Sequence, residues 1–250
     1  MSKNPFLGLG LSGPFTSFAR SYGGGGGGGG ASPPIITEGL TLNLDASNYS
    51  GSGDWLDQSG NGTNVTLNGP TYSSNNGGYF EFDGINDVGT FNAGNAFGFQ
   101  LNPFTFAMWA DTFHDGSWGW YFVNRTSGGT VRTMIGVAGS NEKFHMDGTS
   151  NLANNPALPI NQFSGWKHYV CVREGTGTNQ FKLYINGELI GSLTNNKNYS
   201  TDGTSGYIGA NVTSEPIKAK IGSFRTYNNK ALTAAEVLQN YNANKTRFGL

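Results

Sequence analysis

The sequence predicts an all-β fold in which two antiparallel sheets pack as a sandwich, with one short C-terminal helix and an extended N-terminal arm. The first observation is composition: the 250 residues include 40 glycines and only 12% charged residues, against about 25% in an average soluble domain. The second is a series of short segments with alternating apolar residues, and the third is a single late segment with helical spacing. Short strands joined by polar, glycine-rich turns give such a composition, whereas long surface helices need more Lys, Glu, Arg and Ala.

The predicted strands begin near residue 36 and follow one another at short intervals. The stretch TEGLTLNLDAS places Leu40, Leu42 and Leu44 on one face, and FTFAMWAD at 104–111 alternates in the same way. Asn186-Gly187 lies between two strand patterns in FKLYINGELIGSLT, which is the strongest short hairpin signal. Further strands are expected in YFEFDG, VGTFN, WYFVNR, VRTMIGVA, EKFHMD, WKHYVCVRE, GYIGA and IKAKIGSFRTYN.

The segment ALTAAEVLQNYNANKTR at 231–247 changes to a helical period. Thr233 can cap this helix, and Glu236, three residues later, would complete a capping box. Val237, Leu238 and Tyr241 are predicted to form its apolar stripe.

Residues 1–22 form the predicted arm, followed by a Gly/Pro linker at 23–35 and a folded domain at 36–250. The arm is too short to offset its own ordering entropy by burial. It is therefore either a disordered tail or a peptide that docks on another chain. A solvated tail would not normally carry so many large apolar residues, which favours docking through Phe6, Leu7, Leu9, Leu11, Phe15, Phe18 and Tyr22.

Charge and cysteine content exclude several classes of protein. The 15 basic and 16 acidic residues give a net charge of −1, with no block of like charge. Binding to nucleic acid would need a basic stripe, and a membrane span would need about 18 consecutive apolar residues; neither is present in the sequence. Cys171 is the only cysteine, so an intrachain disulfide and a Cys-based zinc site are excluded. Its position in WKHYVCVRE predicts a buried, inert thiol.

Five stretches, taken as a set, resemble laminin G-like domains, which belong to the concanavalin A-like lectin/glucanase jelly rolls. They are WLDQSGNG, YFEFDGINDVGTF, FTFAMWAD, WKHYVCVREG with NQFKLYINGELIGS, and AKIGSFRTYNNKALTAAEVLQNYN. The resemblance covers roughly residues 40–250 and implies a jelly-roll sandwich. The glycine-rich arm and the stretch ALTAAEVLQNYNANKTRFGL are also similar in style to virion proteins of tailed bacteriophages.

The resemblance departs from the family pattern in the last strand. An acid usually follows the isoleucine there, but Ile221 is followed by Gly222 and Ser223. If that acid helps to bind calcium in relatives, the site is incomplete in this chain. Asp83 and Asp87 in FDGIND are the candidate calcium ligands; the alternative is that their carboxylates cap a turn. No other cofactor is expected.

The sequence does not predict an enzyme. Jelly-roll glucanases need two carboxylates facing each other across a cleft, often as E-x-D-x-x-E on one strand, and this pattern is absent from the sequence. The three histidines lack metal-ligand spacing, and His168 is predicted to be a hydrogen-bonded structural residue.

Glycan binding has two candidate stretches, because sugar recognition combines aromatic platforms with polar hydrogen-bonding groups. DTFHDGSWGWYF supplies His114, Asp115, Trp118 and Trp120, although either tryptophan could instead point into the core. Trp55, close to Asp54 and Asp57, is a weaker candidate.

The sequence thus favours a non-enzymatic virion structural protein of the capsid decoration or head-fibre type. Its arm would contact other virion proteins, and the lectin-like sandwich would be displayed on the exterior surface of the virion, as a homo-oligomer or in many copies. The alternative hypothesis is a carbohydrate-binding tail-fibre or adhesion module that recognises host-surface glycans. Neither hypothesis involves nucleic acid or a membrane.

Overall fold

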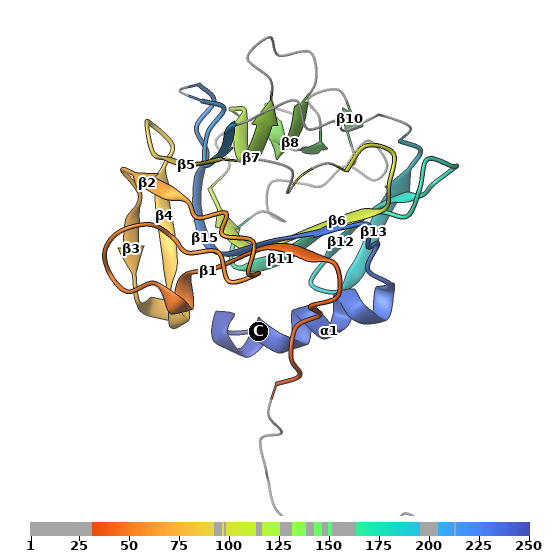
Figure 1. Cartoon of the computed structure of the whole chain (residues 1–250), viewed down its shortest axis with the longest axis horizontal. Coiled ribbons are helices and arrows are strands. Elements are labelled where there is room, and N and C mark those ends of the chain that lie inside the picture. The colour runs from red at the N-terminus through yellow and green to blue at the C-terminus, as the bar shows by residue number, and fades with distance from the viewer. Residues whose placement is uncertain are drawn as a thin grey trace, which may run out of the picture. The chain divides into compact units, whose positions relative to one another are not determined.

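The chain divides into two units, Met1–Ala31 and Ser32–Leu250. The computed structural model in Figure 1 describes residues 32–92, 97, 99–113, 117–125, 132–138, 143–146, 150–151, 164–195, 205–212 and 214–250. The predicted docking arm (1–22) and most of the predicted linker (23–35) lie outside the described residues, as do His114 and Asp115.

Two antiparallel sheets form the body of the second unit (Figure 1). The first sheet has the order β13 (Glu188–Leu193), β12 (Phe181–Ile185), β11 (Lys167–Arg173), β6 (Phe104–Thr112), β15 (Lys218–Asn228), β4 (Tyr79–Asp83), β3 (Thr71–Ser73). Its eighth strand, β1 (Leu40–Asp45), pairs with residues 223–227 of β15, beyond the stretch at 218–221 that pairs with β4.

The second sheet has the order β10 (Ser150–Asn151), β9 (Lys143–Met146), β8 (Arg132–Ala138), β7 (Gly119–Arg125), β14 (Ser205–Ile208), β5 (Val88–Asn92), β2 (Thr66–Asn68). One helix, α1 (Ala234–Asn244), and the 3-10 turns η1 (Ala46–Asn48), η2 (Asn75–Gly77) and η5 (Lys245–Phe248) complete the described elements. The predicted two-sheet antiparallel sandwich with a short C-terminal helix is confirmed.

The main core lies between the two sheets and is rich in aromatic rings. On β6, Phe104, Phe106 and Met108 point into this core, as their alternation predicts. Phe106 packs against Phe122 from the opposite sheet, with ring centroids 5.3 Å apart. The sheets are therefore held together by burial of apolar surface, which is the dominant favourable term in folding.

A second, smaller core lies on the other face of the eight-stranded sheet, where α1 covers it (Figure 1). The helix begins with the predicted capping box, in which Thr233 and Glu236 each bond the backbone of the other. Val237 is fully buried against the sheet, but Leu238 is 46% exposed, which corrects the predicted stripe. Leu238 instead lies over the turn between β12 and β13, where it would come within 2.9 Å of a Cβ placed on Gly187.

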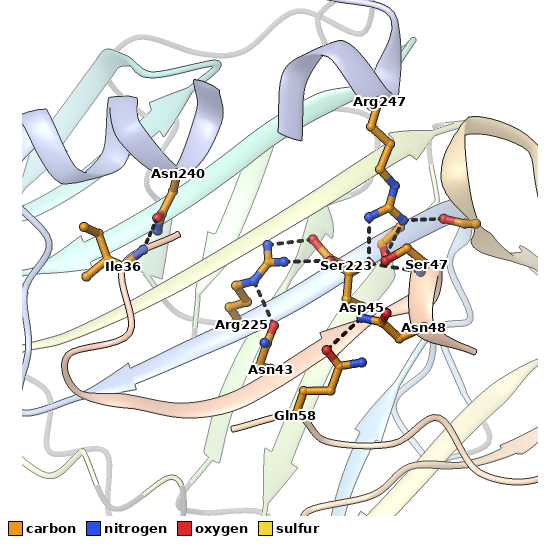
Figure 2. A network of polar contacts seen from close by, with 12 residues as sticks. Ile36, Asn43, Asp45, Ser47, Asn48, Gln58, Ser223, Arg225, Asn240 and Arg247 are labelled. Atoms are coloured by element: carbon orange, nitrogen blue, oxygen red, sulfur yellow. Dashed lines mark hydrogen bonds and ion pairs between the residues drawn. The ribbon is translucent and has the colours of Figure 1, made fainter. Parts of the chain in front are cut away.

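The buried polar residue of α1 is Asn240, which the apolar pattern did not identify. The Ile36 backbone N–H donates to its Oδ1 at 2.8 Å, as Figure 2 shows. The Asn240 side-chain amide donates to the Tyr227 hydroxyl, which in turn donates to the Ile36 carbonyl. These three bonds satisfy buried polar groups and attach the segment before β1 to the helix.

Two local features of the strands follow from turn and bulge geometry. The hairpin at Asn186-Gly187 is confirmed: both residues have positive φ, 53° and 86°, as a type I′ turn requires. Leu42 and Leu44 enter the main core, but a register shift between Leu40 and Leu42 turns Leu40 toward the second core. A β-bulge reverses which face a side chain occupies, so Leu40 does not share a face with the other two leucines.

Asp45, Arg225 and Arg247 form an ion-pair network that we call the arginine cluster (Figure 2). Each oxygen of Asp45 accepts from one arginine, at 2.8 Å from Arg225 and 2.6 Å from Arg247. Burial by itself would raise the pKa of Asp45, but the two arginine charges and the N–H of Ser47 outweigh it and hold the pKa below its ordinary value. The cluster joins β1, β15 and the turn η5.

Phe248, next to Arg247, completes an aromatic stack on the same sheet. Its ring lies 4.4 Å from that of Trp109 and 4.5 Å from that of Trp166. A Cβ at Gly222 would lie 2.6 Å from the Phe248 ring. The sequence departure at Gly222 is therefore explained by packing, because any larger residue there would displace Phe248.

No helix among the described residues combines the length and the apolar character that crossing a membrane requires.

Candidate functional site

A groove with a volume of about 660 Å³ lies where strand ends of both sheets meet. The turn after β4, the residue after β6, the start of β7 and the segment before β15 all contribute to it. Its lining residues are Asp83, Gly84, Ile85, Phe113, Ser117, Trp118, Gly119, Val137, Glu215, Pro216, Ile217 and Lys218. Eight large apolar side chains are exposed in the described part of the chain, and three of them, Ile85, Phe113 and Trp118, line this one groove. This concentration of exposed apolar side chains makes the groove the candidate binding surface.

Trp118 lines this groove and Trp120 does not, although both were predicted as sugar platforms. Trp118 is 40% exposed, whereas Trp120 is only 3% exposed. Their rings stack, with centroids 5.7 Å apart and planes 28° from parallel. Trp120 therefore supports Trp118 from beneath and does not itself offer an open ring face, which corrects its predicted role.

Glu215 is the functional candidate that the sequence did not identify. Its Oε2 accepts from the indole N–H of Trp120 at 2.8 Å and from the side-chain amide of Asn211 at 3.0 Å. The described residues supply no hydrogen bond or ion pair to its other oxygen, Oε1. The two hydrogen bonds to Oε2 fix the orientation of the carboxylate, and Oε1 is available to a ligand.

The backbone around Glu215 is built to hold this orientation. Asn211 and Ser214 bond each other through both backbone amides, at 2.9 and 3.0 Å. Glu215 follows with a φ of +52°, in the left-handed region that a glutamate rarely adopts. Backbone strain of this kind persists only where surrounding structure enforces it, and it concentrates at functional sites.

The floor of the groove depends on Gly119. A Cβ at this position would lie 3.0–3.1 Å from three atoms of Ile217, including its Cα. The start of β7 can therefore approach the segment before β15 only because residue 119 lacks a side chain. This approach brings Trp118 and Glu215 into the same groove.

Among the described lining residues, the charged groups are two carboxylates, Asp83 and Glu215, and one ammonium, Lys218. The Nζ of Lys218 lies 5.9 Å from the centre of the Phe113 ring, and that of Lys220, which does not line the groove, lies 5.5 Å from it. The lining residues therefore carry a net negative charge beside their apolar surface.

Asp83 and Asp87, the predicted calcium ligands, are used within their own turn. The Oδ1 of Asp83 accepts from the backbone N–H groups of Ile85 and Asn86, and the Oδ2 of Asp87 accepts from that of Asp83. Burial, and less strongly the nearby Asp83 charge, raise the pKa of Asp87, against the effect of that hydrogen bond. No group of three or more His, Cys, Asp or Glu suited to a metal ion exists among the described residues. The hydrogen bonds of Asp83 and Asp87 are those of turn-capping carboxylates, the alternative that the sequence left open.

Trp55, the weaker predicted platform, is only 1% exposed and packs against Phe80 with ring centroids 4.9 Å apart. It is a core residue and offers no ring face to a ligand, so this prediction is corrected. Nearby Asp57 accepts from the backbone N–H groups of Asn43, Ser59 and Thr63. The stretch WLDQSGNG is thus a turn held by its aspartate, as its composition predicts.

His168 and Cys171 on β11 are both buried. Burial, with a smaller effect from the Arg225 charge, lowers the pKa of His168 to about 3, so the imidazole is neutral. Its ring stacks on Trp109, 5.1 Å away. Burial raises the pKa of the Cys171 thiol, which makes it unreactive. Cys171 is the buried, unreactive thiol that the sequence predicts. His168 is a buried structural residue, but the prediction that its imidazole is hydrogen-bonded is wrong: its Nδ1 has no partner among the described residues, and its backbone bonds Asn186 instead.

The groove can therefore hold a small polar ligand between an aromatic face and a fixed acceptor. Its volume lies within the range of about 300–1,000 Å³ that ligand sites usually occupy. Trp118 supplies the apolar face and Glu215 the acceptor, while two of the predicted site residues, His114 and Asp115, lie outside the described part of the chain.

Residues 83–238, more than half of the chain, match a family model described as the concanavalin A-like lectin/glucanases superfamily (laminin G type 3). No curated protein sequence matches the chain.

Solved structures share the fold at low sequence identity. Domain 4 of the extracellular GH43 arabinanase AbnA from Geobacillus stearothermophilus, in complex with arabinotriose, is 19% identical, with a TM-score of 0.63 over 81% of this chain and 98% of that one. The binding domain of Paraclostridial Mosquitocidal Protein 1 is 16% identical, with a TM-score of 0.63 over 82% of this chain and 52% of that one.

A botulinum neurotoxin type C structure, from work that ties cell entry to two ganglioside molecules, is 16% identical. Its TM-score is 0.60 over 83% of this chain and 52% of that one. The chain therefore spans about half the length of these toxin domains, and such identities establish a common fold only.

Proposed function

Because the chain belongs to the concanavalin A-like lectin/glucanases superfamily, we propose that its sandwich is a non-enzymatic carbohydrate-binding module. The Trp118 groove is its binding site. One observation carries this proposal: a partly exposed tryptophan, Trp118, lines the same groove as Glu215, a carboxylate whose orientation is fixed by two N–H donors. Sugars present an apolar ring face and hydroxyl donors, and this pair of groups matches both.

The fold alone would not support a ligand class, because one fold hosts many functions. The similar structures add a choice of probes, since one was determined with arabinotriose and another concerns gangliosides. The support for sugar binding by this chain comes from the side chains that line the groove.

A glycan array tests the proposal with the full chain and a matched pair of variants. Wild type binds at least one glycan class, and Trp118→Ala removes most of that signal because the stacking surface is lost. Leu56→Ala, which truncates a still more exposed apolar side chain (55% against 40% for Trp118) outside the groove, retains the signal. A silent array for wild type, or equal loss in both variants, contradicts the proposal.

Catalysis is tested separately, because the groove lining contains two carboxylates. The chain lacks the E-x-D-x-x-E pattern of jelly-roll glucanases. We expect no release of reducing sugar from arabinan, β-glucan or galactan after prolonged incubation. Release that Glu215→Gln abolishes would overturn the non-enzymatic assignment.

A second proposal concerns the location of the module, and it rests on the sequence of the first 35 residues. An apolar arm followed by eight consecutive glycines suits a domain displayed from a large assembly. We propose that the chain is a structural or adhesion protein on the exterior of a bacteriophage virion, held there by residues 1–22 in many copies. Multivalent display would strengthen weak sugar contacts.

Deletion of residues 1–22 tests this location. The truncated chain should remain folded and soluble, retain glycan binding, and no longer co-purify with particles. If the truncated chain still assembles onto particles, the arm is not the anchor and this second proposal fails, while the first stands.

A further inference from the structure

The hydrogen bonding of Glu215 indicates which chemical groups a ligand of the groove must carry. Its Oε2 accepts two hydrogen bonds, from Trp120 and Asn211, while its Oε1 has no partner among the described residues. An ionised carboxylate has no hydrogen to donate, so it acts only as a hydrogen-bond acceptor. The ligand group that reaches Oε1 must therefore be a donor, such as a sugar hydroxyl.

The charge of the described lining residues disfavours one class of sugar. Among these residues, Asp83 and Glu215 are anionic and Lys218 is the only cation. A sugar carboxylate or phosphate brought to Oε1 would meet a like charge, and juxtaposed like charges are strongly unfavourable. A neutral sugar meets no such repulsion.

From these contacts we infer that the groove selects neutral sugars over acidic ones, with Glu215 as the hydroxyl acceptor and Trp120 as its positioning residue. This inference rests on the proposed function, because it specifies the ligand of the same groove. Trp120 has two connected tasks: its ring supports Trp118, and its N–H fixes Glu215.

Two substitutions separate these tasks. In Glu215→Gln, the side-chain oxygen has to face the Trp120 and Asn211 donors, so an NH₂ donor replaces Oε1 as the group available to the ligand. Trp120→Phe retains an aromatic ring beneath Trp118 and deletes the donor to Glu215. Glu188→Gln on β13, an exposed glutamate outside the groove lining, is the matched control.

The experiment measures calorimetric affinities of the full chain for two matched probe pairs: galactotriose against trigalacturonic acid, and lactose against 3′-sialyllactose. Arabinotriose is added as a further neutral probe. Wild type should bind at least one neutral member about tenfold or more tightly than its acidic counterpart. Glu215→Gln should weaken that binding by about tenfold or more, since a hydrogen bond to a charged group is lost.

Trp120→Phe should weaken neutral-sugar binding by about threefold to tenfold and lower the neutral-to-acidic ratio, while Glu188→Gln changes neither. If Trp120 had a purely structural role, its substitution would weaken binding of neutral and acidic sugars equally, and the ratio of the two affinities would not change. Circular dichroism spectra and melting curves of each variant confirm that the binding measurements are made on folded protein.

The remaining outcomes distinguish the inference from the proposed function. Tighter binding of the acidic members, or unchanged neutral-sugar binding in Glu215→Gln, overturns the inference and leaves glycan binding through Trp118 intact. Absence of binding to every probe and across the glycan array overturns both.

Discussion

The arginine cluster and the Trp118 groove both combine a carboxylate with aromatic rings. They differ in how many carboxylate oxygens are paired and in how deeply the rings are buried. Both oxygens of Asp45 accept from arginines, and the neighbouring Trp109 is fully buried beneath Phe248. In the groove, only one oxygen of Glu215 is engaged by described residues, and Trp118 is exposed on one side. A fully paired buried carboxylate serves folding, whereas a fixed but half-paired carboxylate at the surface suits a ligand.

The comparison predicts that substitutions in the arginine cluster change stability and leave binding intact. The largest effect is expected for Asp45→Ala, which leaves two largely buried guanidinium groups without their carboxylate. Removal of one partner from a buried ion pair costs about 3–5 kcal/mol. Urea unfolding of this variant, with Glu188→Gln as control, checks the value.

Sugar binding of the folded fraction of Asp45→Ala should equal that of wild type. If this variant loses binding while it remains folded, the two regions are coupled and the separation of their roles is wrong.

Gly222→Ala tests the packing of Phe248 on β15. The added methyl group would lie 2.6 Å from the Phe248 ring, and overpacking of this kind costs about 1–3 kcal/mol. Thermal unfolding measures the loss. In Phe248→Ala the same glycine substitution should cost much less, because the ring that clashes is gone; additive losses would show that Gly222 has another role.

The buried imidazole of His168 predicts a dependence of stability on pH. Its pKa is about 3 in the folded state against 6.5 for the ordinary group, so between these values the unfolded chain binds a proton that the folded chain excludes. Stability is complete above pH 6.5 and falls as the pH decreases, by about 1.4 kcal/mol at pH 5.5. His168→Phe, which retains a ring against Trp109, should remove this slope.

Asp45 acts in a lower pH window, which separates the two contributions. Its pKa lies below the ordinary value of 3.8 in the folded state, so its contribution is present above that value and is lost as the pH falls further. A slope near pH 5.5 that persists in His168→Phe would contradict the assignment to His168.

The smallest effect concerns Cys171, whose thiol is buried on β11. Because burial raises the pKa of this thiol, a thiol reagent such as DTNB should not label the native chain within hours. One equivalent should react after unfolding. Rapid native labelling would show that the main core opens near β11.

Much of the fold could be predicted because local and global signals agree along most strands. The alternation in β6, the Asn186-Gly187 turn and the Thr233–Glu236 capping box each specify their own geometry from adjacent residues. Leu40 could not be predicted, since a bulge between it and Leu42 depends on pairing with β15, which is distant in the sequence. Asn240 is buried for a similar reason: its partners Ile36 and Tyr227 come from other elements.

The candidate site was only partly predictable. Trp118 and Trp120 are two residues apart in one strand-like stretch, so their pattern could not say which is exposed; the stack and the bond to Glu215 decide it. Glu215 could not be identified as a site residue from the sequence, because a single glutamate before Pro216 belongs to no recognised binding motif. Its importance arises from a left-handed backbone and from two donors 4 and 95 residues away.

Ligands are proposed to bind in the Trp118 groove and not against the aromatic stack around Phe248. Fluorine NMR of the chain labelled with 5-fluorotryptophan tests this proposal. The five tryptophans are Trp118 in the groove, Trp120 stacked behind it, Trp109 and Trp166 in the aromatic stack, and Trp55 in the core. Titration with the neutral oligosaccharide that gives the strongest array signal should shift the Trp118 and Trp120 resonances and leave the other three unchanged. Saturable shifts of the Trp109 or Trp166 resonance, with the Trp118 resonance unchanged, would show that ligands bind at the stack instead.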